Sequence, residues 1–256
     1  MADAIAGALP RLAVQPAQRI AARVVGIITL LAMALSMWVE FVALGPIVIS
    51  DDPATTANSV AGAVLFVRIA VALSLACFIS DVAVGAASYV VLRHVNRGLA
   101  ALGALFRVAN AVILALSALA LLVVLRLVSD APYLSAFTVE QSQSLVRLLF
   151  GVRADTMSLG WVFLGLGQAV FAWLWLRSKY IPAPLAIVGI VASMMLALFP
   201  LLAMLLPAFG QVVGIAYMAP MFLYEVTLGI LLLVRGIREP PHAQGKASQA
   251  PSIAAG

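Results

Sequence analysis

The sequence predicts an all-α membrane protein, a polytopic helical bundle with six transmembrane helices and both termini in the cytoplasm. Apolar residues make up 64% of the 256 positions, against roughly 45–50% in a soluble domain. Charged residues make up 10%, where about 25% is usual, and the mean hydropathy is +1.14. Six apolar runs reach the roughly 20 residues that a transmembrane helix needs. These observations exclude a soluble globular enzyme, a disordered chain and a disulfide-stapled secreted domain.

The first three predicted helices are separated by short polar turns. Before the second helix, Asp52 has the residue type of an N-cap, and Pro53 then occupies the first helical position. An arginine-rich turn precedes the third helix. We expect these helices over residues 24–49, 60–92 and 99–128.

The second half of the chain begins with a polar connection and a short helix predicted to lie in the membrane interface. Thr138 and Gln141 have the spacing of a capping box, in which two side chains satisfy free backbone amides reciprocally. A leucine-rich face follows, as in helices that rest on the membrane surface. Three further spans are expected over residues 157–176, 184–206 and 211–234.

The predicted domain organisation is one transmembrane domain, residues 23–235, between two cytoplasmic segments. Residues 1–22 form the first segment, and residues 236–256, rich in Pro, Ala, Ser and Gly, form a tail predicted to be disordered. Of the 15 basic residues, 11 lie on the side of the two termini and four on the opposite side. By the positive-inside rule, both termini are therefore predicted to be cytoplasmic.

No cofactor is expected, because suitable ligands are too few. Cys77 is the single cysteine, so neither an intrachain disulfide nor a thiolate metal cluster can form. The two histidines, His94 and His242, fall in a loop and in the tail, which excludes an intramembrane bis-histidine haem or a three-histidine zinc site. The net charge of +5 is spread over helix ends. The expected partner is therefore the lipid bilayer, and no nucleic acid is expected.

Five ionisable residues lie well inside the predicted spans: Glu40, Arg68, Asp81, Arg107 and Glu225. Each charge near a helix centre costs roughly 2.5–3.5 kcal/mol on insertion scales, so these side chains are expected to face the interior and to find partners. Residues equidistant from the turn of an antiparallel hairpin lie at one depth. Asp81 and Arg107 are equidistant from position 94, and Glu40 and Arg68 from position 54. Two depth-matched acid–base pairs are therefore predicted.

Glu225 adds a second carboxylate to one of these pairs. It precedes Arg235 by ten residues, about 15 Å along a helix, and so can join Asp81 and Arg107. An excess buried carboxylate must be protonated, hydrated or used. Asp81, Arg107 and Glu225 are therefore candidate ligand- or proton-binding residues, and Glu40 with Arg68 a candidate buried ion pair. The alternative that these charges only fix helix packing stays open.

A series of short segments along the chain has the order and spacing of a known family. The segments are WVEF at 38–41, LFVR at 65–68, ISDVA at 79–83, LFRV at 105–108, YLSAF at 133–137, GWVFLG at 160–165, YE at 224–225 and LVRG at 233–236. Over roughly residues 19–238 the chain resembles the bacterial membrane family called domain of unknown function 4386. The resemblance implies a six-helix protein of the bacterial inner membrane and supplies no established activity.

The favoured functional hypothesis is a multi-pass membrane protein that binds a small molecule or a lipid, or a transporter-like bundle, through the buried Asp-Arg-Glu group. Six spans without an internal repeat are few for a carrier, so the transporter version predicts a homodimer. The alternative is a non-catalytic structural or accessory membrane protein. An intramembrane enzyme is less favoured, because Asp81 would have to activate Ser80 or Ser88 without a histidine in the span.

Overall fold

The computed structural model describes residues 14–48, 52–129 and 132–238. In this part of the chain the structure is helical throughout, without strands. The elements in chain order are α1 (Pro16–Met37), the π-helix η1 (Trp38–Leu44), α2 (Pro53–Gly62), α3 (Val64–Leu92), α4 (Arg97–Leu127), the short 3-10 helix η2 (Pro132–Ala136), α5 (Val139–Ser178), α6 (Ala183–Leu205), α7 (Pro207–Val213), the 3-10 turn η3 (Ala216–Met218) and α8 (Ala219–Val234).

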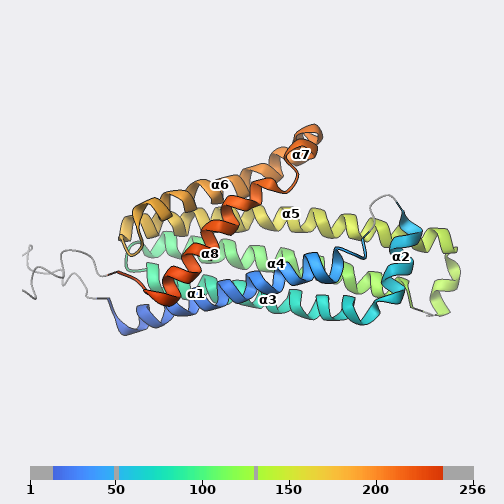
Figure 1. The fold of residues 1–256 in the computed structure, drawn as a ribbon, viewed down its shortest axis with the longest axis horizontal. Helices are drawn as coiled ribbons and strands as arrows, with labels where there is room; N and C mark the ends of the chain where they lie inside the picture. Colours follow the sequence, from blue (N-terminus) through green and yellow to red (C-terminus); the bar gives the residue numbers. More distant parts are fainter. Residues whose placement is uncertain (1–13, 49–51, 130–131, 239–256) are drawn as a thin grey trace, which may run out of the picture.

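Six of the described helical segments are long and apolar enough to cross a membrane: α1 with η1, α3, α4, α5, α6, and η3 with α8. The predicted fold class, an all-α bundle with six transmembrane helices, is confirmed. The orientation of the termini stays a prediction. The start of α1, the α3–α4 turn, the α5–α6 turn and the end of α8 lie at the same end of the bundle (Figure 1).

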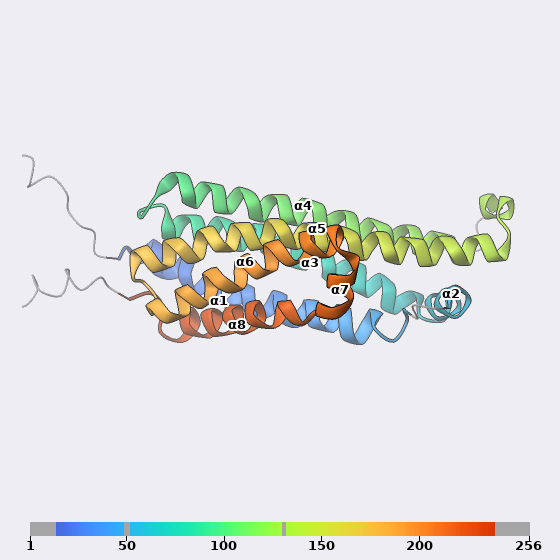
Figure 2. The same cartoon turned by 90° about the horizontal axis from the view of Figure 1, so that it is seen from above.

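The long helices form a closed ring. Each packs mainly on the next in the order α1, α3, α4, α5, α6 and α8, and α8 packs back on α1 (Figures 1 and 2). The main neighbours of α8 among the long helices are therefore α1 and α6, and it faces α3, α4 and α5 across the ring interior. This topology turns side chains from opposite sides of the ring toward one another.

Glycines bring neighbouring helices of the ring close together. A Cβ atom on Gly165 of α5 would lie 2.6 Å from the carbonyl oxygen of Ser193 on α6. A Cβ atom on Gly26 of α1 would lie 2.7 Å from the carbonyl oxygen of Gly229 on α8. Small residues permit such backbone approach in membrane helices, where packing and not the hydrophobic effect drives association.

Local sequence signals account for several helix starts. The Asp52 side chain accepts a hydrogen bond from the Thr55 backbone amide at 3.0 Å, as expected for the N-cap of α2. Asn96 caps α4 in the same way, accepting from the Leu99 amide at 2.9 Å. The reciprocal capping box at the start of α5, formed by Thr138 with the third helical residue, is also present.

The interfacial helix predicted after Thr138 is not separate from the fourth span. Residues 139–178 form the single helix α5 of 40 residues, about 60 Å long at 1.5 Å per residue. No proline interrupts this stretch, and the Thr156 and Ser158 hydroxyls bond to carbonyls of the preceding helical turn and do not cap a new helix. Arg153, which lies where the sequence predicted a boundary, is 8% exposed and paired, so its charge does not end the helix.

Three other element boundaries differ from the prediction. α1 begins at Pro16 rather than near residue 24 and ends in the π-helix η1. The second span begins at Val64, because α2 is a separate helix that ends at Gly62 and is followed by Ala63 with a non-helical φ of −124°. The last segment is broken around Gly214, whose φ of +52° favours glycine. The predicted tail lies largely outside the described residues, as do residues 1–13.

Candidate functional site

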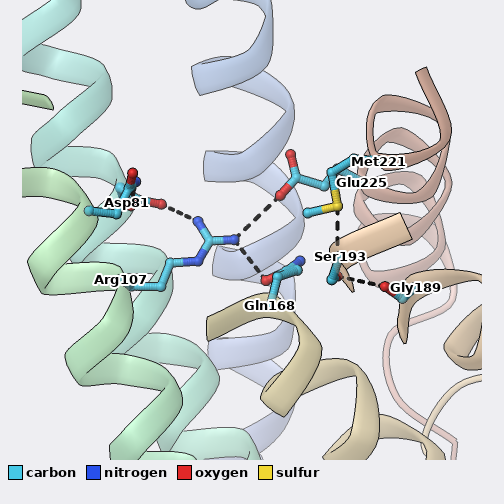
Figure 3. A network of polar contacts seen from close by, with 8 residues as sticks. Asp81, Arg107, Gln168, Gly189, Ser193, Met221 and Glu225 are labelled. Carbon is cyan, nitrogen blue, oxygen red and sulfur yellow. Dashed lines mark hydrogen bonds and ion pairs between the residues drawn. The ribbon is translucent and has the colours of Figure 1, made fainter. Parts of the chain in front are cut away.

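Three of the predicted site residues, Asp81 on α3, Arg107 on α4 and Glu225 on α8, meet inside the ring (Figure 3). The Arg107 guanidinium forms an ion pair with Asp81 through Nη1. Its Nη2 lies 3.4 Å from Glu225 Oε1. The three side chains are 6%, 12% and 14% exposed in the order Arg107, Asp81 and Glu225, so the group is withdrawn from the surroundings of the bundle.

Two further polar residues complete this group, which we call the Arg107 cluster. Gln168 on α5 accepts a hydrogen bond from Arg107 Nη2 at 2.8 Å. Asn110, three residues after Arg107 on α4, donates through Nδ2 to Asp81 Oδ2 at 2.6 Å. The cluster thus joins α3, α4, α5 and α8. The sequence interpretation did not assign Asn110 or Gln168 to the site, although each is a buried amide within an apolar helix.

Helix register explains why these residues share one depth. The capped turn at Asn96 reverses the chain between α3 and α4. Arg107 lies ten residues after Arg97, the first residue of α4, and Glu225 lies ten residues before Arg235, which follows α8. Both are therefore about 15 Å from the same end of the bundle at 1.5 Å per residue, well inside a hydrocarbon core about 30 Å thick.

Glycines pack the helices tightly around the cluster. A Cβ atom on Gly85 of α3 would lie 3.1 Å from Arg107 Cβ. A Cβ atom on Gly160 of α5 would lie 3.0 Å from Asn110 Oδ1 and closer still to a side-chain methyl of Leu114. The backbones of α3 and α5 therefore stand close to α4 on both sides, which fixes the position of Arg107.

The cluster leaves polar groups without a hydrogen-bond partner. Within the described residues, Arg107 Nε, Asn110 Oδ1 and the Tyr224 hydroxyl are buried and unpartnered. Tyr224 is 1% exposed, and its ring packs so closely against Gly189 of α6 that a Cβ atom there would overlap it. Buried polar atoms are usually satisfied, so Arg107 Nε and Asn110 Oδ1 give the cluster unused hydrogen-bonding capacity, and the hydroxyl of Tyr224, the residue before Glu225, is a third such group.

The predicted ion pair between Glu40 and Arg68 is wrong in its basic partner. Glu40 on η1 pairs with Arg153 on α5 and not with Arg68: Arg153 Nη1 donates to Glu40 Oε2 at 3.2 Å, and Nη2 binds Oε1. Arg68 lies at a matching depth but on the outer face of α3, since its neighbours Val67 and Val71 fill the interior. Equal distance from a turn fixes the depth of a residue, not the direction in which it points.

A protein-family model matches nearly the whole bundle. The family described as Domain of unknown function (DUF4386) matches residues 24–236. The chain belongs to this family. The matched part of this DUF4386 chain includes the Arg107 cluster and the Glu40–Arg153 pair. No curated protein matches the chain. No solved structure matches it.

The chemistry available to this DUF4386 chain follows from the charges in the cluster. Two carboxylates face one guanidinium, so with all three ionised the cluster carries one net negative charge. A proton or a cationic group at the second carboxylate would balance that charge, whereas an anionic group would compete with it for Arg107. The described residues contain no group of three or more His, Cys, Asp or Glu that could hold a metal ion.

Proposed function

We propose that this membrane protein binds a small molecule, or a lipid, in a transporter-like bundle whose polar site is the Arg107 cluster. The observation that carries the proposal is the convergence of Asp81 and Glu225 on Arg107 inside the ring. One ion pair is enough to fix helix register, and it leaves no charge uncompensated. A second carboxylate on the same guanidinium adds a charge that a purely structural pair does not need.

The contacts divide the cluster into a fixed part and an exchangeable part. Asp81 is held from both sides, by Arg107 Nη1 and by Asn110 Nδ2. Glu225 has one contact of 3.4 Å, to an Nη2 that also donates to Gln168 at 2.8 Å. We therefore assign Arg107 and Asp81 to a stable anchor. Glu225 is the residue that takes up a proton or the cationic group of a ligand.

The surroundings of Glu225 support a moving role for α8. This helix packs on α1 and α6 and reaches the other side of the ring through its side chains. It begins after the irregular segment around Gly214, with Pro220 in its first turn. Interrupted helices next to intramembrane polar residues are a feature of transporters. Neutralising Glu225 would weaken the link from α8 to Arg107 and let α8 shift relative to α4.

We further propose that the protein lies in the bacterial inner membrane with both termini cytoplasmic. Eight basic and no acidic residues flank the helices at one end of the described bundle; we call this the basic end, and its members are Arg19, Arg23, Arg93, Arg97, Arg177, Lys179, Arg235 and Arg238. The positive-inside rule places such an end in the cytoplasm. A C-terminal fusion to green fluorescent protein should fluoresce in cells, and a periplasmic phosphatase at the same position should be inactive.

The decisive experiment measures proton flux through Glu225. Purified protein is reconstituted into vesicles that contain a pH-sensitive dye, and a pH gradient is applied. We expect flux above that of empty vesicles for the wild type, and loss of that flux for Glu225→Gln. The matched control is Glu40→Gln, which neutralises the carboxylate of the separate Glu40–Arg153 pair and should retain flux. Native mass spectrometry of the wild type and Glu225→Gln then asks whether a small molecule or lipid stays bound.

The same variants test the structural alternative. If Glu225→Gln matches the wild type in flux and in bound molecules, the proposal is wrong. A structural role for the charges predicts a different result: the single changes Asp81→Arg and Arg107→Asp damage the fold, and the double exchange restores it. Circular dichroism and elution volume of each purified variant measure that outcome.

A further inference from the structure

An apolar groove lies on the outside of the ring, whereas the Arg107 cluster lies in its interior. An open groove of about 280 Å³ runs between α4, α5 and α6. Its walls are apolar side chains, among them Leu99 and Phe106 of α4, Leu166 and Trp173 of α5 and Met194 of α6. None of the residues that line it is charged.

The groove begins at the basic end and runs toward the middle of the membrane. Leu99 and Phe106 are seven residues apart on α4, as are Leu166 and Trp173 on α5, which corresponds to about 10 Å along each helix. One leaflet contributes about half of the roughly 30 Å hydrocarbon core. The groove therefore covers most of the depth that one acyl chain occupies below its headgroup.

Positive charge surrounds the start of the groove. The Arg177 guanidinium carbon lies 5.7 Å from the centre of the Trp173 ring, one helical turn away on α5. Arg97, the first residue of α4, lies at the depth where the groove begins. In the described part of the basic end no acidic residue offsets these charges. A headgroup at this position therefore meets a cationic surface directly above an apolar groove.

We propose that this groove is a binding site for an anionic phospholipid, with an acyl chain between α4 and α5 and the phosphate on Arg177 and Arg97. The charge at the start of the groove selects the headgroup, because arginines at the membrane surface attract anionic lipids and stack on aromatic rings. The site is independent of the ligand proposed for the Arg107 cluster. The bound acyl chain and the cluster lie on different sides of α4 at the same depth, since Phe106, which lines the groove, directly precedes Arg107.

Trp173 supplies a direct probe of the groove, because its ring lines it and is 45% exposed. The full-length protein is reconstituted in phosphatidylcholine vesicles that contain increasing fractions of brominated phosphatidylglycerol, or of brominated phosphatidylcholine. Bromine quenches tryptophan fluorescence on contact. The difference between the wild type and Trp173→Phe isolates the signal of Trp173 from that of the other tryptophans.

We expect brominated phosphatidylglycerol to quench Trp173 at no more than about one fifth of the fraction that brominated phosphatidylcholine requires, since one surface arginine alone gives a preference of that size. Arg177→Gln should reduce this preference toward equality, and Arg97→Gln is an independent second variant. The matched control is Arg23→Gln, an exposed arginine of the basic end on α1, away from the groove. Equal quenching by both lipids in the wild type overturns the proposal. An unchanged preference in both Arg177→Gln and Arg97→Gln overturns it as well.

Discussion

Replacing Arg107 with glutamine should destabilise the bundle more than neutralising either of its carboxylate partners. Arg107→Gln removes the one positive charge and leaves Asp81 and Glu225 buried without compensation. Removing one partner of a buried ion pair costs about 3–5 kcal/mol. Neutralising Asp81 or Glu225 leaves a balanced ion pair behind, because the carboxylate that remains neutralises the guanidinium.

The contacts then rank the two carboxylates. Asp81→Asn keeps an oxygen for Arg107 but weakens two hydrogen bonds to a charged group, which we expect to cost about 1.5–3 kcal/mol. Glu225→Gln alters one 3.4 Å contact. Interhelical hydrogen bonds in membranes are worth about 0.6 kcal/mol on average, so the expected loss for Glu225→Gln is below about 1 kcal/mol.

Unfolding in bicelles, followed by circular dichroism or steric trapping, measures this order. The control is Arg68→Gln, which changes an exposed arginine on the outer face of α3. The reasoning from charge balance is refuted if Arg107→Gln is no more destabilising than Glu225→Gln, or if it unfolds within about 1 kcal/mol of the wild type.

Three further outcomes are expected elsewhere in the bundle. Arg153→Gln leaves Glu40 unpaired. Since that glutamate is 35% exposed, the free energy of unfolding should fall by about 1–3 kcal/mol, between the values for exposed and buried pairs. The control Arg68→Gln should stay within about 0.5 kcal/mol of the wild type in the same unfolding assay. Gly165→Ala places a Cβ atom 2.6 Å from the α6 backbone, so overpacking should lower the unfolding free energy by about 1–3 kcal/mol, and wild-type stability would contradict the close packing. The hydrogen bonds at the α2 N-cap lower the pKa of Asp52 below 3.8; because its folded-state pKa is depressed, its contribution to α2 is complete above pH 3.8 and is lost as the pH falls through the folded value. Hydrogen exchange in α2 should therefore be faster in Asp52→Ala than in the wild type at pH 6, and the difference should shrink toward pH 3.

The sequence allowed the six spans and the three charged members of the Arg107 cluster to be predicted, because both depend on properties that run along the chain. Apolar length identifies a span, and the distance from a turn gives the depth of a residue. These two quantities placed Asp81, Arg107 and Glu225 at one level, and the structure brings their side chains together.

The remaining features depend on which way a residue points, and the distance from a turn does not contain that information. Arg68 has a suitable depth and faces outward, whereas Arg153 faces inward to Glu40. Arg153 was not recognised as an intramembrane charge because the fourth span was predicted to begin at residue 157. A continuous α5 would have placed Arg153 inside a span. Asn110 and Gln168 were missed because uncharged amides are a weaker signal than charges in an apolar helix.

The length of α5 makes the molecule asymmetric about the membrane. At the average tilt of about 20°, a helix of about 60 Å still extends about 56 Å along the membrane normal, more than the roughly 40–45 Å of a bilayer with its headgroups. Beyond the level of α7, α5 continues beside the last turns of α4 (Figure 2). This helical projection offers an antibody fragment an epitope outside the bilayer, and so provides a landmark for aligning single particles of a small membrane protein in electron cryomicroscopy.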